Sequence, residues 1–127
     1  MLKRPKFAFN SSGTLMARDD GALFVGIWDL ESEERTEPVF RIPLSGLGLA
    51  ALHFRADDEL VSLTRDGRIV CWRIQGDDEP GFEEIWQHSF RTEITAACAM
   101  REPSSRQSIF VAGDAKGFLM LINISGD

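Results

Sequence analysis

The chain has 127 residues, 43% of them hydrophobic and 27% charged, and its 14 Lys and Arg against 20 Asp and Glu leave a net charge of −6. This composition is typical of a folded globular domain and excludes a disordered or fibrous chain. The acidic balance argues against a nucleic-acid binder. The longest uncharged stretch is also far shorter than the roughly 20 apolar residues of a membrane-spanning helix.

Two further features set the expected compartment. The first residues contain no apolar segment of the kind that a secretory signal needs. Cys71 and Cys98 both lie in apolar runs, which suits small buried thiols better than a disulfide framework. We therefore expect one cytoplasmic domain that spans residues 1–127.

The first part of the chain predicts a series of short strands. A short apolar strand and a polar turn are followed by a second strand, an Asp-Gly turn, a third strand that contains Trp28, an acidic loop and one further strand. Glycine accepts positive φ without steric cost, so Asp-Gly before an alternating run predicts a hairpin. The landmarks of this unit are residues 6–9, 10–13, 20–21, 24–30, 31–37 and 38–42.

The same pattern is repeated twice more. Trp72 follows Trp28 by 44 residues, and its counterpart Ile122 comes 50 residues later. A longer hairpin at residues 102–107 explains the larger second spacing. Runs rich in Val, Ile, Phe and Trp between Gly, Asp and Pro predict strands, about eleven in all. The expected units are residues 6–42, 49–88 and 94–124.

The repeated unit resembles a WD repeat, the four-stranded blade of a β-propeller. Trp28 and Asp29 stand at the position of the dipeptide that names the family, and Trp72-Arg73 is a degenerate copy. The resemblance implies an all-β partial propeller of three antiparallel blades. It also implies structural turn or anchor roles for Asp20, Trp28, Asp29, Asp66, Trp72, His88 and Asp114. The family's hydrogen-bonded His–Ser/Thr–Asp–Trp set is complete in none of the three units.

Three blades do not close a ring, because propellers usually have four to eight. In WD-type blades the outer strand comes from the start of the next unit, so the last blade here should lack its outer strand. Unpaired edges and uncovered faces drive association with other chains. A second copy, the rest of a larger propeller or a different chain could each complete the ring, and these alternatives stay open.

The pattern predicts no catalytic residue, metal ligand or cofactor site. The only imidazoles, His53 and His88, have no local nucleophile and carboxylate with which to form a catalytic set. The G-x-G-x-x-A pattern at residues 46–51 precedes a strand, whereas a dinucleotide site needs a helix there. The acidic clusters lack the ligand spacing of a calcium loop. We therefore expect no enzymatic activity, although a propeller hydrolase that uses His88 is an alternative.

The expected function is a scaffold for protein partners, with no nucleic-acid or membrane ligand, that works as a homo-oligomer or as part of a larger propeller. Acidic loops between the units should share one rim and attract a basic partner. The candidate partner-binding residues are Glu33, Glu34, Phe40, Asp77, Asp78, Phe82 and Trp86. The last unit is also similar to the final blade of C-terminal propellers on STAND-type signalling ATPases, which implies a ligand sensor as the alternative function.

Overall fold

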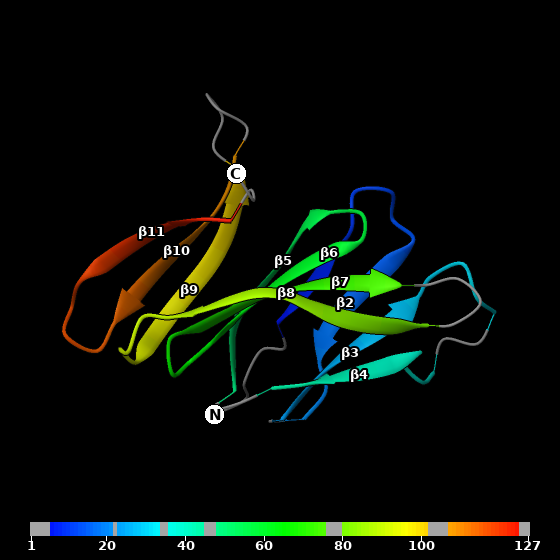
Figure 1. Ribbon diagram of the computed structural model, residues 1–127, viewed down its shortest axis with the longest axis horizontal. Coiled ribbons are helices and arrows are strands. Elements are labelled where there is room, and N and C mark those ends of the chain that lie inside the picture. The colour runs from blue at the N-terminus through cyan, green and yellow to red at the C-terminus, as the bar shows by residue number, and fades with distance from the viewer. Residues whose placement is uncertain are drawn as a thin grey trace.

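The computed structural model describes residues 6–21, 23–33, 36–44, 48–75, 80–101 and 107–124. These residues form an all-β fold of eleven strands in three antiparallel sheets (Figure 1). Sheet 1 contains β1 (Phe7–Phe9), β2 (Leu15–Asp19), β3 (Phe24–Asp29) and β4 (Phe40–Pro43). Sheet 2 contains β5 (Leu49–Ala56), β6 (Glu59–Thr64), β7 (Arg68–Gln75) and β8 (Gly81–Ser89). Sheet 3 contains β9 (Ile94–Arg101), β10 (Ser108–Asp114) and β11 (Leu119–Asn123).

Each sheet is a simple meander in which consecutive strands pair antiparallel. The turns between the second and third strands contain Gly21, Gly67 and Gly117, all with positive φ, as the Asp-Gly pattern predicts. In chain order, β4 of sheet 1 is followed by β5 of sheet 2, and β8 of sheet 2 is followed by β9 of sheet 3. Sheet 3 has three strands among the described residues. The predictions of an all-β partial propeller, of about eleven strands and of a last blade without its outer strand are therefore confirmed.

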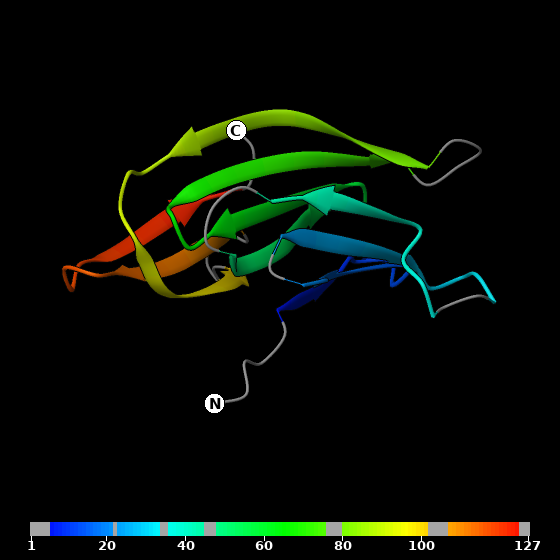
Figure 2. The ribbon, with the colours of Figure 1, turned by 90° about the horizontal axis from the view of Figure 1, so that it is seen from below.

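The inner strands of the three sheets lie beside one another, as in the blades of a propeller. β5 contacts both β1 and β9, and Figure 2 shows β8 along the side of the molecule that is opposite β1 and β9. The side of the molecule formed by β1, β5 and β9 is lined in part by the small side chains of Ala50, Ala51, Ala97 and Ala99. The chain is therefore an arc of blades around one axis.

Sheet 2 is covered on both faces because its side chains alternate between two cores. Along β6, Leu60 points toward sheet 1 and Val61 toward sheet 3, and both are 0% exposed. The core between sheets 1 and 2 consists of Ala17, Val25, Ile27, Ile42, Leu52, Phe54, Leu60 and Ile74. The core between sheets 2 and 3 consists of Ala50, Ala51, Val61, Leu63, Ile69, Cys71, Ile94, Phe110, Ala112 and Ile124.

Sheets 1 and 3 each have one covered face and one open face. We call these the open face of sheet 1, with Phe7, Phe9, Met16, Phe24 and Trp28, and the open face of sheet 3, with Cys98, Met100, Ile109, Val111, Leu119 and Leu121. Leu119 and Leu121 are 72% and 70% exposed, and Phe7 and Phe9 are 57% and 51% exposed. Both ends of the arc therefore present apolar side chains to solvent.

The first prediction concerns two glycines that have the same φ of +87° but different surroundings. A Cβ at Gly67 would lie 2.4 Å from the backbone oxygen of Thr92, whereas a Cβ at Gly117 would meet nothing within 4 Å. Gly117→Ala therefore adds only the cost of a left-handed backbone, about 1–2 kcal/mol. Gly67→Ala adds the same cost plus a collision with the segment that leads into β9.

Urea denaturation of both variants separates these two effects. We expect Gly67→Ala to lower the free energy of unfolding clearly more than Gly117→Ala, with similar m-values for the two variants. Equal losses would show that the packing of Gly67 against Thr92 does not contribute to stability.

Candidate functional site

The aspartates of the predicted tight turns organise the backbone around them in different ways. Asp114 accepts hydrogen bonds from the N–H groups of Lys116 and Phe118 at 3.0 and 2.8 Å, and from the hydroxyl of Thr92 at 3.3 Å. The Thr64 hydroxyl contacts the carboxylate of Asp66. These contacts tie each hairpin to its own sheet, and through Thr92 to the segment before β9.

Asp20 and Asp29 lie at opposite ends of sheet 1. Asp20 forms an ion pair with Arg41 at 2.5 Å, and Asp29 accepts the N–H of Glu31 at 3.0 Å. The Asp20 carboxylate raises the pKa of Arg41, first through the hydrogen bond between them. Asp20 therefore connects the turn before β3 to β4, and Asp29 stabilises the turn that follows β3.

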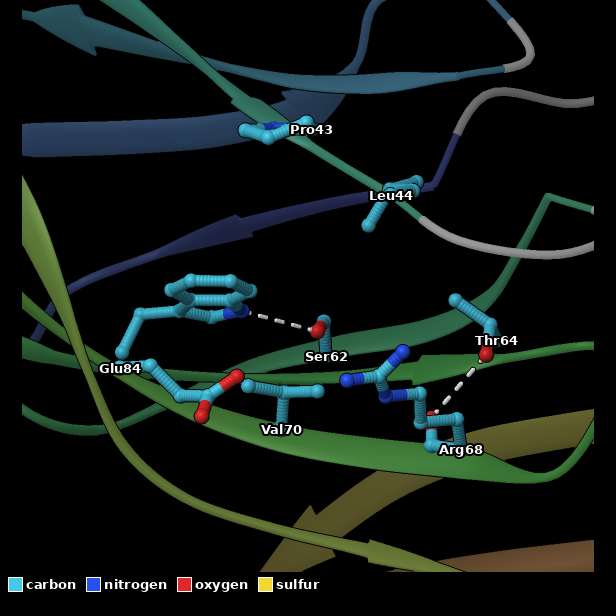
Figure 3. Close-up of a pocket in the computed structure, with 8 residues that line it drawn as sticks. Pro43, Leu44, Ser62, Thr64, Arg68, Val70 and Glu84 are labelled. Carbon is cyan, nitrogen blue, oxygen red and sulfur yellow. Dashed lines mark hydrogen bonds between the residues drawn. The ribbon is translucent and has the colours of Figure 1, made fainter.

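Trp72 lies on the face of sheet 2 that points toward sheet 1. Its indole N–H donates a hydrogen bond to the Ser62 hydroxyl at 3.1 Å, and its ring meets Phe82 edge to face at 5.6 Å. A small pocket of about 80 Å³ adjoins this pair (Figure 3). Its lining consists of Pro43, Leu44, Ser62, Thr64, Arg68, Val70, Trp72 and Glu84.

Trp28 is 8% exposed although it lies on the open face of sheet 1. A Cβ at Gly26 would lie 2.6 Å from its ring, and 3.3 Å from Pro38. The guanidinium of Arg18 is 5.3 Å from the centroid of the Trp28 ring, a cation–π distance. The indole is therefore covered by its own sheet, because position 26 has no side chain.

The candidate partner-binding residues do not form one surface. Phe40 and Phe82 stack at 5.7 Å between sheets 1 and 2, with Phe82 38% exposed. Trp86 packs on the other face of sheet 2, against the core with sheet 3 and 5.7 Å from the Arg55 guanidinium. Glu33 is exposed. The predictions for Glu34, Asp77 and Asp78 fall outside the described residues.

The two histidines lie in different surroundings. His53 connects sheets 2 and 3 through a 3.0 Å hydrogen bond between its Nε2 and the hydroxyl of Ser108. Burial, and next the charge of Arg101, lower the pKa of His53. His88 is exposed on β8, where its ring meets Phe90 edge to face at 4.8 Å.

Hydrogen bonds between Asp57 and the turn at residues 10–12 join sheets 1 and 2, and the sequence pattern does not reveal them. We call this set of contacts the Asp57 clasp. The Asp57 carboxylate accepts hydrogen bonds from the Ser11 hydroxyl at 2.7 Å and the Ser12 N–H at 3.0 Å. The Asn10 side-chain amide donates to the Asp57 carbonyl at 3.1 Å. The Ser11 and Ser12 hydrogen bonds lower the pKa of Asp57. The sequence pattern does not link the turn between β5 and β6 to the turn between β1 and β2, although the two turns occupy equivalent places in neighbouring units.

The described residues contain no group of three or more His, Cys, Asp or Glu side chains that could hold a metal ion. Among the same residues, no helix has the length and apolar character to cross a membrane.

Comparison with solved structures identifies the architecture. The chain is similar over 100% of its length to the β-propeller domain of Cps50 (Swd1) from Myceliophteria thermophila, with a TM-score of 0.67 and 19% identity. Over 99% of its length it is similar to the WD40 domain of SCAP from fission yeast, with a TM-score of 0.67 and 13% identity. The fold is that of part of a WD40 β-propeller.

The chain spans only part of these WD40 propellers, namely 37% and 32% of the two matched chains. At these identities the likeness concerns the fold. Sequence comparison finds no matching protein-family model and no curated relative.

The second prediction concerns the clasp around Asp57. We expect Asp57→Ala to destabilise the fold at neutral pH, whereas Asp58→Ala, an exposed neighbour in the same turn, should have a smaller effect. The native pKa of Asp57 lies below its ordinary value. Its carboxylate therefore stabilises the fold above the pKa of the unfolded state, and this contribution is lost as pH falls through the native pKa.

Urea midpoints measured from neutral pH down to about pH 3 test this dependence, since an unperturbed Asp titrates near pH 3.9. The difference in urea midpoint between the wild type and Asp57→Ala should decrease as the pH falls. The corresponding difference for Asp58→Ala should change less. A gap for Asp57→Ala that is independent of pH would contradict the role of the carboxylate.

Proposed function

We propose that the chain is a non-enzymatic, cytoplasmic scaffold for protein partners. In this proposal it is a WD40-type propeller segment that completes its ring with further blades and binds proteins through its rim and loops. The likeness of the fold to WD40 propeller domains supports a role in protein interaction. The single observation that carries the proposal is the pair of open faces at the ends of the arc.

The open face of sheet 3 is equivalent to the faces of sheets 1 and 2 that pack on the next sheet. Val25 and Ile27 on β3 face sheet 2, and Ile69 and Cys71 on β7 face sheet 3. Leu119 and Leu121 are at the equivalent alternate positions of β11. The described chain has no further sheet to pack on them, and both are exposed. Contiguous apolar patches of this kind mark interaction sites. A further blade would cover them in the way sheet 2 covers sheet 1.

Within the part of the chain that the structure describes, β11 is an edge strand of sheet 3. β11 pairs with β10 on one side, and the fourth position of sheet 3 is empty among the described residues. The sequence of β11, Leu-Met-Leu-Ile-Asn, contains no charge or proline that would discourage pairing. An added strand would gain backbone hydrogen bonds along this edge. The edge and the open face thus favour the same kind of partner, a β-sheet that continues the arc.

The missing blades could come from a second copy, from the rest of a larger protein or from a different chain. A second copy could pack its open face of sheet 1 on the open face of sheet 3, and the same contact repeated would give a six-bladed ring. A larger protein that contains this segment could supply the blades instead. A closed ring of two copies has a defined mass, whereas head-to-tail contacts that do not close continue indefinitely.

The third prediction uses Cys98 as a reporter for the open face of sheet 3. Cys98 is exposed next to Val111, while Cys71 is buried in the core between sheets 2 and 3. Burial raises the pKa of Cys71 to about 11. We expect a thiol reagent to label Cys98 in the folded protein and Cys71 only after unfolding, and raising the protein concentration should slow the labelling of Cys98.

Light scattering on the same samples gives the mass of the protein in solution. Leu121→Lys tests whether the open face of sheet 3 forms the contact. The lysine should shift the protein toward single copies and restore fast labelling of Cys98. Gln75→Lys, an exposed change at the end of β7, should do neither. A wild-type protein that stays a single copy at every concentration, with freely reactive Cys98, would contradict ring completion by a second copy.

A further inference from the structure

A hollow lies between sheets 1 and 2, at the end of the molecule where β3 and β7 terminate. Its volume is about 180 Å³, and its lining consists of Thr14, Leu15, Ile27, Asp29, Glu31, Val39, Phe40 and Ile74. A cavity needs roughly 10–15 Å³ to hold one water molecule. The hollow is therefore large enough to accept a side chain from another molecule.

The floor of the hollow is apolar and fixed by the core. Ile27 and Ile74 are 1% and 4% exposed and belong to the core between sheets 1 and 2. Val39 at the mouth is 45% exposed, and Phe40 stacks on the partly exposed Phe82. An apolar group that enters the hollow would remove both itself and these walls from water, which is favourable.

The mouth of the hollow carries negative charge. Asp29 and Glu31 belong to the lining, and the carbonyl of Asp58 accepts the N–H of Ile74 at 2.7 Å, which places the Asp57–Asp58 turn beside it. Arg41, which follows Phe40 in the chain, is paired with Asp20 and Glu37. The Asp29 and Glu31 carboxylates of the lining therefore favour lysine or arginine over the phosphates of a nucleic acid.

We propose that this hollow, with its apolar floor and acidic mouth, binds one apolar side chain of a basic peptide segment in a partner protein. The proposal rests on the proposed scaffold function and names one of its partner sites. The apolar side chain contacts Ile27, Val39 and Phe40. The flanking cations of the peptide interact with Asp29 and Glu31.

Two synthetic probes test the proposal with the full 127-residue chain. One is a capped pentapeptide with a central leucine between two pairs of lysines, and the other has alanine in place of the leucine. Because the apolar surface of leucine is buried in the hollow, the leucine peptide should bind roughly tenfold more tightly. Fluorescence anisotropy of labelled peptides measures both dissociation constants.

Three variants assign the binding to this hollow. Glu31→Lys should weaken both peptides about fivefold or more, as expected for reversal of a charge at the site. Glu93→Lys changes the net charge equally, but at an exposed position before β9, and should leave affinity unchanged. Val39→Trp places a large ring at the mouth and should abolish the preference for leucine over alanine. Circular dichroism verifies that each variant is folded.

Several outcomes would overturn the proposal. These are no binding of the leucine peptide, equal affinity for leucine and alanine peptides, or equal weakening by Glu31→Lys and Glu93→Lys, which would show attraction by overall charge alone. The Cys98 labelling and mass measurements do not involve this hollow. If the peptides fail while those measurements succeed, this site is wrong and the scaffold function stands. If both fail, ring completion by a second copy is wrong as well.

Discussion

Everything in this arc of sheets depends on one constraint: a sheet with two apolar faces has to be covered on both of them. β6 shows it most clearly, since Leu60 and Val61 are neighbours in the chain yet lie in different cores. No single sheet of this kind is stable alone, because both of its apolar faces would remain in water. The propeller meets the constraint by repetition, with each blade covering the next.

Polar contacts at the sheet ends add orientation to this apolar stacking. The hydrogen bonds of Asp57 to the Ser11–Ser12 turn hold sheet 2 against sheet 1. The hydrogen bond between His53 and Ser108 does the same for sheets 2 and 3. Both connect residues that are more than 40 positions apart. Such contacts are directional, so they fix how neighbouring blades are aligned, whereas apolar burial only requires that they touch.

The sequence predicted the features that depend on local rules. Alternating runs and Asp-Gly pairs act within a few residues, so the hairpins and the number of strands followed from them. The faces taken by the aromatic side chains depend on register. A bulge between Cys71 and Trp72 shifts the pairing of β7 with β8, and Phe82 and Trp86 lie on opposite faces of sheet 2.

The Asp57 clasp and the covered position of Trp28 were beyond such rules. The first joins turns from different units, and the second depends on the missing side chain of Gly26 two residues away. Phe40, predicted as a partner-binding residue, stacks on Phe82. In each case the deciding contact lies between segments whose distance only the assembled fold defines.

The central position of sheet 2 has a consequence for local fluctuations. In a linear stack, each blade is held by its neighbours, so the end blades open first and the middle one last. Backbone amides of β6 should accordingly exchange with deuterium most slowly, and those of β11 much faster. When a missing neighbour docks at the sheet 3 end, the slow-exchanging region should extend into that sheet, so the progress of ring closure can be followed residue by residue.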